Sequence, residues 1–172
     1  MFFFAHLGLG LGLAWLVAWK LPVSFDYRLV LFGTLLPDII DKPLGYVLGL
    51  EGRIWAHTLV FLFVILALSF APRLWSLRFV AFGVGTHYLV DRLWESPRIL
   101  LYPAFGWSFN PVAFDTERWV YTLLNDPLVQ AGEIVGLMIL IVFAWHYRLG
   151  SWKALGEFAR HGTLPAVVRN QP

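Results

Sequence analysis

Five apolar runs alternate with short polar segments along the chain, and this pattern predicts a helical membrane protein. The runs cover residues 2–19, 29–40, 54–71, 75–94 and 128–147. A helix of about 20 apolar residues matches the hydrocarbon thickness of a bilayer. The second run is too short to cross alone, at about 1.5 Å per residue. We expect it to tilt, to extend from Tyr27, or to continue through Pro43 to Leu50 as a broken helix that lines a polar cavity.

The first run is expected to be a retained transmembrane helix. No basic segment precedes it and no small-residue cleavage site closes it, as a removable signal peptide would require. Gly8, Gly10 and Gly12 follow one another on alternate positions. These glycines either allow close contact with a neighbouring helix or face lipid, and their spacing does not decide between the two.

The remaining segments are polar or mixed. Residues 95–127 combine prolines, aromatic residues and charges, and are predicted to form an interfacial lid over one membrane face. In the tail, Trp152, Leu155 and Phe158 recur at three-residue spacing, which predicts a short amphipathic surface helix followed by a disordered end. We therefore expect one domain over residues 1–147 and a cytoplasmic tail over residues 148–172.

Composition supports the membrane assignment. Hydrophobic residues make up 59% of the 172 residues and charged residues only 14%, against about 25% charged residues in typical soluble domains. The absence of cysteine excludes disulfides, thiolate metal sites and a cysteine nucleophile. The basic residues behind the pI of 9.1 are scattered between apolar runs, so they predict membrane topology and not a nucleic-acid surface.

The distribution of charge predicts the orientation. When the runs alternate across a membrane, most basic residues fall on one side and most acidic residues on the other. Cytoplasmic loops are enriched in Lys and Arg. The basic side, which includes the C-terminus, is therefore predicted to be cytoplasmic, and the N-terminus extracytoplasmic.

The candidate chemistry centres on Gly83–Asp91, where an apolar run carries His87 and Asp91. Residues four apart share one helix face, and together they can bind a divalent metal. The alternative is a buried His–Asp hydrogen bond that only ties two helices together. The predicted topology brings further ligand-type residues to the same extracytoplasmic side: His6, Asp38, Asp41 and His57. His146 and His161 lie on the other side and are interpreted as ordinary surface residues.

This set of side chains suits zinc or another first-row divalent ion, as one ion or two. The predicted ligands are His6, Asp38, His57, His87 and Asp91. Asp41 is either a catalytic base or the hydrogen-bond partner of a ligating histidine. Arg53 either binds an anionic headgroup or is a snorkelling interfacial arginine. A bound metal would generate hydroxide near neutral pH, which points to hydrolysis.

Five short pieces, in order, resemble the YdjM-like family, described as inner-membrane-associated metal-dependent hydrolases. The pieces are His6 in the first run, Leu36–Asp41, Arg53–Thr58, Gly85–Asp91 and the stretch from Leu101 to Trp107. The ligand order is also similar to that of zinc-dependent phospholipase C and the single-strand-specific zinc nucleases. Those helical enzymes use a further His and a His-x-x-x-Glu pair downstream, which nothing after Asp91 supplies in the outer half of this chain.

The sequence thus predicts an all-α, multi-pass inner-membrane bundle with an extracytoplasmic metal site. Its expected activity is phospholipase C-like hydrolysis of a lipid-borne phosphoester, with membrane lipid as substrate and no nucleic-acid partner. A carboxylic ester or an amide is also open to attack by metal hydroxide. The alternatives are a non-catalytic, metal-stabilised adaptor and, with less support, a metal or proton transporter, because the ligands lie at one end of the runs and not at mid-membrane.

Overall fold

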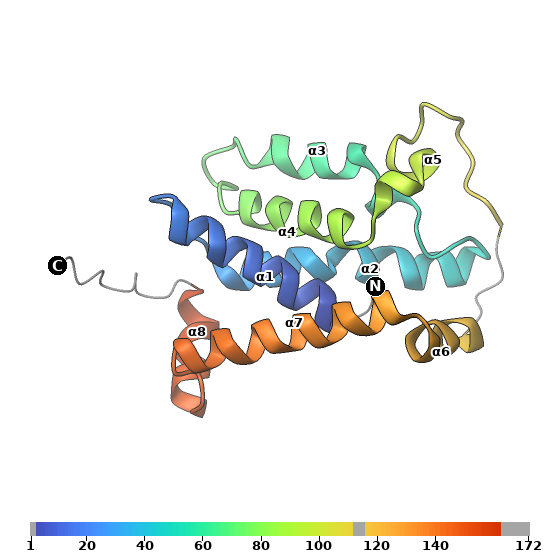
Figure 1. Cartoon of the computed structure of the whole chain (residues 1–172). Helices are drawn as coiled ribbons and strands as arrows, with labels where there is room; N and C mark the ends of the chain where they lie inside the picture. The colour runs from blue at the N-terminus through green and yellow to red at the C-terminus, as the bar shows by residue number, and fades with distance from the viewer. Residues whose placement is uncertain (1–2, 112–115, 163–172) are drawn as a thin grey trace.

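The computed structural model describes residues 3–111 and 116–162, and these residues form a bundle of helices (Figure 1). The long helices are α1 (Phe3–Lys20), α2 (Tyr27–Leu48), α4 (Leu77–Val90) and α7 (Pro127–His146). The shorter ones are η1 (Trp55–His57), α3 (Leu59–Leu68), η2 (Leu93–Glu95), α5 (Pro97–Leu100), α6 (Thr116–Asn125) and α8 (Trp152–His161). The predicted all-α fold class is therefore confirmed for the described residues.

Helix α1 lies at the centre of the packing, because it contacts α2, α4 and α7. Helices α2 and α4 pack along each other, α3 covers α4 on the far side, and α7 runs along α1 (Figure 1). Four helices begin at capping side chains, a preference that satisfies the free N–H groups of a first turn. These caps are Asp26 for α2, Thr58 for α3, Asp126 for α7 and Ser151 for α8.

Glycine contacts explain how closely the helices approach. A Cβ atom on Gly33 would lie 2.3 Å from the Val80 carbonyl oxygen, and one on Gly83 would lie 2.3 Å from the Val30 carbonyl oxygen. Helices α2 and α4 therefore meet backbone to backbone, as small residues permit in membrane helices. Gly8 meets α7 in the same way, so the choice left open for the first run is decided in favour of helix contact there.

The second apolar run forms a longer helix than its sequence suggested. Helix α2 starts at Tyr27 and runs through both Pro37 and Pro43 to Leu48, where Gly49 adopts the left-handed conformation that ends many helices. The structure therefore confirms both the extension from Tyr27 and the continuation past Pro43. The predicted break in this helix does not occur.

The prediction of about five membrane segments is not confirmed. Helices α1 and α7 are long and apolar enough to cross a membrane. In α7, only 17% of the most apolar 18-residue stretch is buried inside the protein. The third run is shorter than predicted, because residues 55–57 form a 3₁₀ turn and α3 covers ten residues. At about 1.5 Å per residue, α3 is roughly 15 Å long, half of a ~30 Å hydrocarbon core.

Residues 109–111, part of the segment predicted to be interfacial, pack beside the loop between α2 and α3. Leu50 pairs with Pro111 in an isolated β-bridge, the Glu51 N–H donates to the Asn110 carbonyl (3.3 Å), and the rings of Trp55 and Phe109 meet edge to face. The predicted amphipathic surface helix is present as α8. The predicted disordered end falls on residues 163–172, outside the described part of the chain.

Candidate metal centre

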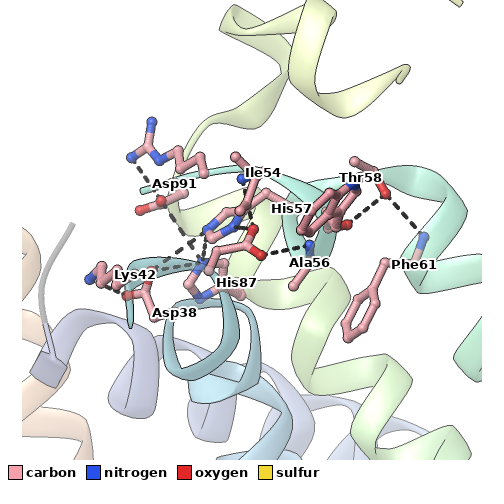
Figure 2. Close-up of polar contacts among 12 residues, drawn as sticks. Asp38, Lys42, Ile54, Ala56, His57, Thr58, Phe61, His87 and Asp91 are labelled. Carbon is pink, nitrogen blue, oxygen red and sulfur yellow. Dashed lines mark hydrogen bonds and ion pairs between the residues drawn. The ribbon is translucent and has the colours of Figure 1, made fainter. Parts of the chain in front are cut away.

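Two histidines face each other at the centre of the candidate site (Figure 2). The Nε2 atoms of His57 and His87 lie 3.1 Å apart, and both side chains are fully buried. The Nδ1 of His57 lies 2.6 Å from a carboxylate oxygen of Asp41, and the Nδ1 of His87 lies 2.8 Å from the Thr34 carbonyl oxygen. Both partners accept hydrogen bonds, so each Nδ1 carries the proton and donates it.

With both rings neutral, these tautomers leave a lone pair on each of the facing Nε2 atoms. A neutral histidine has one donor nitrogen and one acceptor nitrogen, so two acceptors meet at 3.1 Å in the low-dielectric interior. A metal ion beside both atoms, or a proton on one of them, resolves this contact. Orientation of a ligating histidine through the opposite ring nitrogen is the usual arrangement at metal sites.

Asp41 is the buried anchor of the loop that carries His57. Its side chain has no exposed surface and accepts hydrogen bonds from the backbone N–H groups of Ile54 (2.8 Å) and Ala56 (3.0 Å), besides the one from the ring Nδ1 of His57. From the other side, the Tyr88 hydroxyl donates to the carbonyl oxygens of Ala56 and Thr58, both at 2.8 Å. These contacts hold the 3₁₀ turn, and therefore His57, against α2 and α4.

A second group of potential ligands lies against His87. The ring of His6 stacks on that of His87 at 4.1 Å with a 13° tilt. Its Nε2 lies 3.3 Å from Asp91 Oδ1, yet among the described residues neither buried ring nitrogen of His6 makes a hydrogen bond. An unsatisfied buried nitrogen is costly, and ligation of a metal would remove that cost.

The carboxylates at the rim are paired with basic side chains. Asp38 binds Lys42, and the second oxygen of Asp91 lies 2.7 Å from the Arg53 guanidinium. Together with Asp41, the site has three carboxylates and two cationic side chains. While the histidines are neutral, the site therefore carries one net negative charge. Lys42 and Arg53 are also the more exposed members of these pairs, with 30% and 39% of their side chains accessible.

The described residues contain two sets that could hold a metal ion: His6, His87 and Asp91, and Asp38, His57 and His87. In each set the ligand atoms lie within 4.8 Å of one another. His87 belongs to both sets but has only one unprotonated nitrogen, because its Nδ1 donates to Thr34. It can therefore bind one ion only, and a second ion would have to rely on the other residues. The donor set of imidazoles and carboxylates suits zinc or another first-row divalent metal.

All seven residues predicted to form the site come together in the fold. We call the three histidines and three aspartates the His–Asp cluster: His6, Asp38, Asp41, His57, His87 and Asp91. Arg53 lies at its edge. His161 lies elsewhere, within 3.3 Å of Glu157, and the His146 ring lies 5.1 Å from that of Trp15 at an angle of 52°. A hollow of about 1300 Å³ between α1 and α7 is lined by none of the cluster residues.

The sequence reasoning did not select Thr34 or Tyr88. Thr34 acts through its backbone carbonyl, which no side-chain pattern can reveal. Tyr88 lies inside the singled-out stretch, but its role depends on the fold of a loop 30 residues away in sequence.

Comparison with known proteins identifies the family of this chain. A family model described as "YdjM inner membrane protein" matches residues 1–157. The chain belongs to the YdjM inner membrane protein family. No curated protein and no solved structure matches it.

Family membership decides the membrane assignment that helix length alone leaves open, since buried core helices of soluble proteins can be equally long and apolar. It agrees with the exposed apolar surface of α7, where Ile134, Met138 and Ile141 are each more than half accessible. The protein is therefore an inner-membrane protein with two candidate spans among its described residues and a buried cluster able to hold a metal.

Replacement of Asp41 with asparagine is expected to lower metal affinity about 10- to 100-fold, the usual effect of losing the partner of a ligating histidine. The carboxylate of Asp41 accepts three hydrogen bonds through its two oxygens. The asparagine side chain keeps one acceptor oxygen, and its NH₂ group would face N–H donors in place of the other oxygen. Titration of the apo protein with Zn²⁺ in competition with a chromogenic chelator measures the change. The control is Asp26→Asn, which removes a carboxylate from the start of α2, away from the cluster. Equal affinities for Asp41→Asn and wild type would contradict the orienting role.

Proposed function

We propose that this protein is a metal-dependent hydrolase that cleaves a lipid-borne phosphoester at the extracytoplasmic face of the inner membrane. The observation that carries the proposal is the approach of the His57 and His87 Nε2 atoms to 3.1 Å, each on a ring whose Nδ1 faces a hydrogen-bond acceptor, with carboxylate oxygens of Asp38 and Asp91 within 4.0 Å of His87 Nε2. Hydrogen bonds from both Nδ1 atoms orient this pair, which favours a ligand role over a purely helix-tying one.

Each residue of the cluster has a role in the proposed mechanism. His57, His87 and Asp38 would hold one ion, most simply zinc, with His6 and Asp91 completing the ligand set or holding a second ion. A bound zinc ion lowers the pKa of its water to near neutrality and so supplies a hydroxide nucleophile. Asp41 keeps His57 in the ligating tautomer. Its complete burial and three donors favour this orienting role over that of a base.

The two cationic side chains at the rim support a phosphoester substrate. Arg53 presents a planar guanidinium with donors to spare beside its ion pair with Asp91, and guanidinium groups bind phosphate oxygens in bidentate fashion. Lys42 lies on the Asp38 side. With a divalent ion bound, the three carboxylates and two cationic side chains would carry a net positive charge, which favours an anionic phosphate group beside Arg53 and Lys42.

The proposed orientation of the protein follows from charge. The segments next to the cluster are rich in acidic residues and the opposite ends in basic ones, so the positive-inside preference places the cluster outside the cytoplasm and the C-terminus inside. A reporter fused to the C-terminus tests this, and an extracytoplasmic reporter signal would overturn both the orientation and the choice of an outer-leaflet lipid.

The test of the activity compares two classes of substrate. Purified protein in nanodiscs is expected to hydrolyse a phospholipid or a polyprenyl phosphate ester only when loaded with metal, and Arg53→Gln is expected to raise KM for the phosphoester at least tenfold. A bidentate charged hydrogen bond contributes more than 1.4 kcal/mol, which corresponds to that factor. Arg92→Gln is the matched control, since the Arg92 side chain pairs with Glu95.

Hydrolysis of a carboxylic ester with no effect of Arg53→Gln would retain the hydrolase and reject the phosphoester. Stoichiometric metal with no hydrolysis of either substrate class would instead support a metal-stabilised adaptor. That alternative has a specific basis, because the cluster joins α1, α2, η1 and α4. A structural zinc site has four protein ligands and no coordinated water, so water exchange on a Co²⁺-loaded sample distinguishes the two.

A further inference from the structure

Helix α7 contributes none of the six residues of the His–Asp cluster. Its apolar sequence nevertheless carries one carboxylate, which contacts α1, the helix that contributes His6. Glu133 lies in the second turn of α7, between Pro127 and His146. Its carboxylate accepts hydrogen bonds from the backbone N–H groups of Phe4 (2.9 Å) and Ala5 (3.2 Å). These two residues lie in the first turn of α1, immediately before His6.

The contact has a clear electrostatic basis. The first N–H groups of a helix have no partner within the helix, and the helix dipole makes this end positive. A carboxylate from another helix satisfies two of these donors at once. Inside a membrane span an ionisable residue is expensive, so such residues usually have a defined partner and a function. Here the partner is the turn that begins α1.

The two helices also touch next to this contact. A Cβ atom on Gly8 would lie 2.0 Å from the Gly136 carbonyl oxygen, and one on Gly136 would lie 2.1 Å from the Phe4 carbonyl oxygen. Glu133 and Gly136 are three residues apart and therefore share one face of α7. Helix α1 is thus held against α7 on both sides of His6, by the Glu133 carboxylate before it and by the glycine crossing after it.

His6 itself has no hydrogen bond to fix its ring among the described residues. Its position depends on stacking with His87 at 4.1 Å and on the placement of the α1 backbone. We propose that Glu133 is a positioning residue of the metal centre, which holds the first turn of α1 so that the His6 imidazole faces the ion bound by His87 and Asp91. This inference rests on the proposed metal centre and does not require the hydrolase activity.

The test measures metal binding in a double-mutant cycle. Glu133→Gln keeps the size of the side chain but leaves one acceptor oxygen for two N–H donors. It is expected to weaken Zn²⁺ binding about tenfold, in the range seen for residues that orient metal ligands, and to change the visible spectrum of the Co²⁺-loaded protein. In a His6→Ala background, Glu133→Gln is expected to cause no further loss, because both substitutions then act on the same ligand.

The matched control is Asp126→Asn on the same helix. Asp126 caps α7 itself by accepting from the N–H groups of Leu128 and Val129, so its loss destabilises α7 without touching α1. Asp126→Asn is expected to lower the melting temperature and leave the Co²⁺ spectrum unchanged. A role of Glu133 in stability alone would give the same result for Glu133→Gln.

The outcomes separate this inference from the function. A wild-type spectrum and affinity in Glu133→Gln, or additive losses with His6→Ala, would overturn the positioning role. Wild-type protein without metal would overturn it too, together with the metal centre. A tenfold loss that disappears in the His6→Ala background would support it, even if no substrate is hydrolysed and the proposed enzyme activity is rejected.

Discussion

Replacement of His87 with alanine is expected to abolish metal binding, with a fall in affinity of more than 100-fold. His87 is the only residue shared by both sets of candidate ligands, so its loss leaves each set with two members. Loss of a residue that merely orients a ligand already costs 10- to 100-fold, and loss of the ligand itself should exceed this. Elemental analysis of purified wild-type and variant protein measures the effect, and hydrolysis of the lipid phosphoester should disappear with the metal.

His161→Ala is the matched control, because His161 lies in α8 beside Glu157 and away from the cluster. It should retain a wild-type metal content. Near-stoichiometric zinc, manganese or iron in wild type that persists in a folded His87→Ala protein would exclude His87 as a ligand. No metal in freshly purified wild type would instead favour a polar network that ties the helices together, and the hydrolase proposal would lose its chemical basis.

Replacement of Gly83 with alanine is expected to destabilise the protein by about 2–3 kcal/mol, the upper part of the usual range for overpacking. The added methyl would lie 2.3 Å from the Val30 carbonyl oxygen and 2.8 Å from the Gly33 backbone. Both obstacles are backbone atoms, so helices α2 and α4 must move apart. Because α2 carries Asp38 and Asp41 while α4 carries His87, metal affinity should fall as well. Thermal unfolding in detergent, with and without Zn²⁺, measures both effects.

Gly85 provides the control within the same helix. A Cβ atom there would meet no atom within 4 Å, and alanine is preferred over glycine in a helix by up to about 1 kcal/mol. Gly85→Ala should therefore leave the protein as stable as wild type or slightly more stable. Equal destabilisation by the two substitutions would show that helix crossing at Gly83 is not what limits stability.

The sequence predicted the residues of the His–Asp cluster correctly as a spatial group, and the reason is topological. His6 begins an apolar run, Asp38 and Asp41 end one, His57 begins one, and His87 with Asp91 ends another. In a bundle of alternating helices the ends of successive runs meet at one face. Polar residues placed at these ends therefore converge without any knowledge of their side-chain contacts, as the distances in the structure bear out.

The lengths of the elements were predicted less well, because hydropathy does not report backbone hydrogen bonding. The run over residues 54–71 is continuously apolar, yet its start forms a 3₁₀ turn held by the Asp41 carboxylate and the Tyr88 hydroxyl. Conversely, the prolines of α2 suggested a break in a helix that the structure shows to be continuous. In both cases tertiary contacts decided the local structure.

By itself, the sequence determined that the chain is helical and apolar, and which side chains can serve as ligands, because these follow from composition, periodicity and the chemistry of each residue. Only the tertiary structure decided how the ligands act. The protonation of His57 and His87 depends on acceptors supplied by other helices, the close approach of α2 and α4 depends on glycines that face each other, and the first turn of α1, next to His6, donates hydrogen bonds to the distant Glu133 carboxylate. These are contacts between distant residues, and no local pattern in a single sequence encodes them.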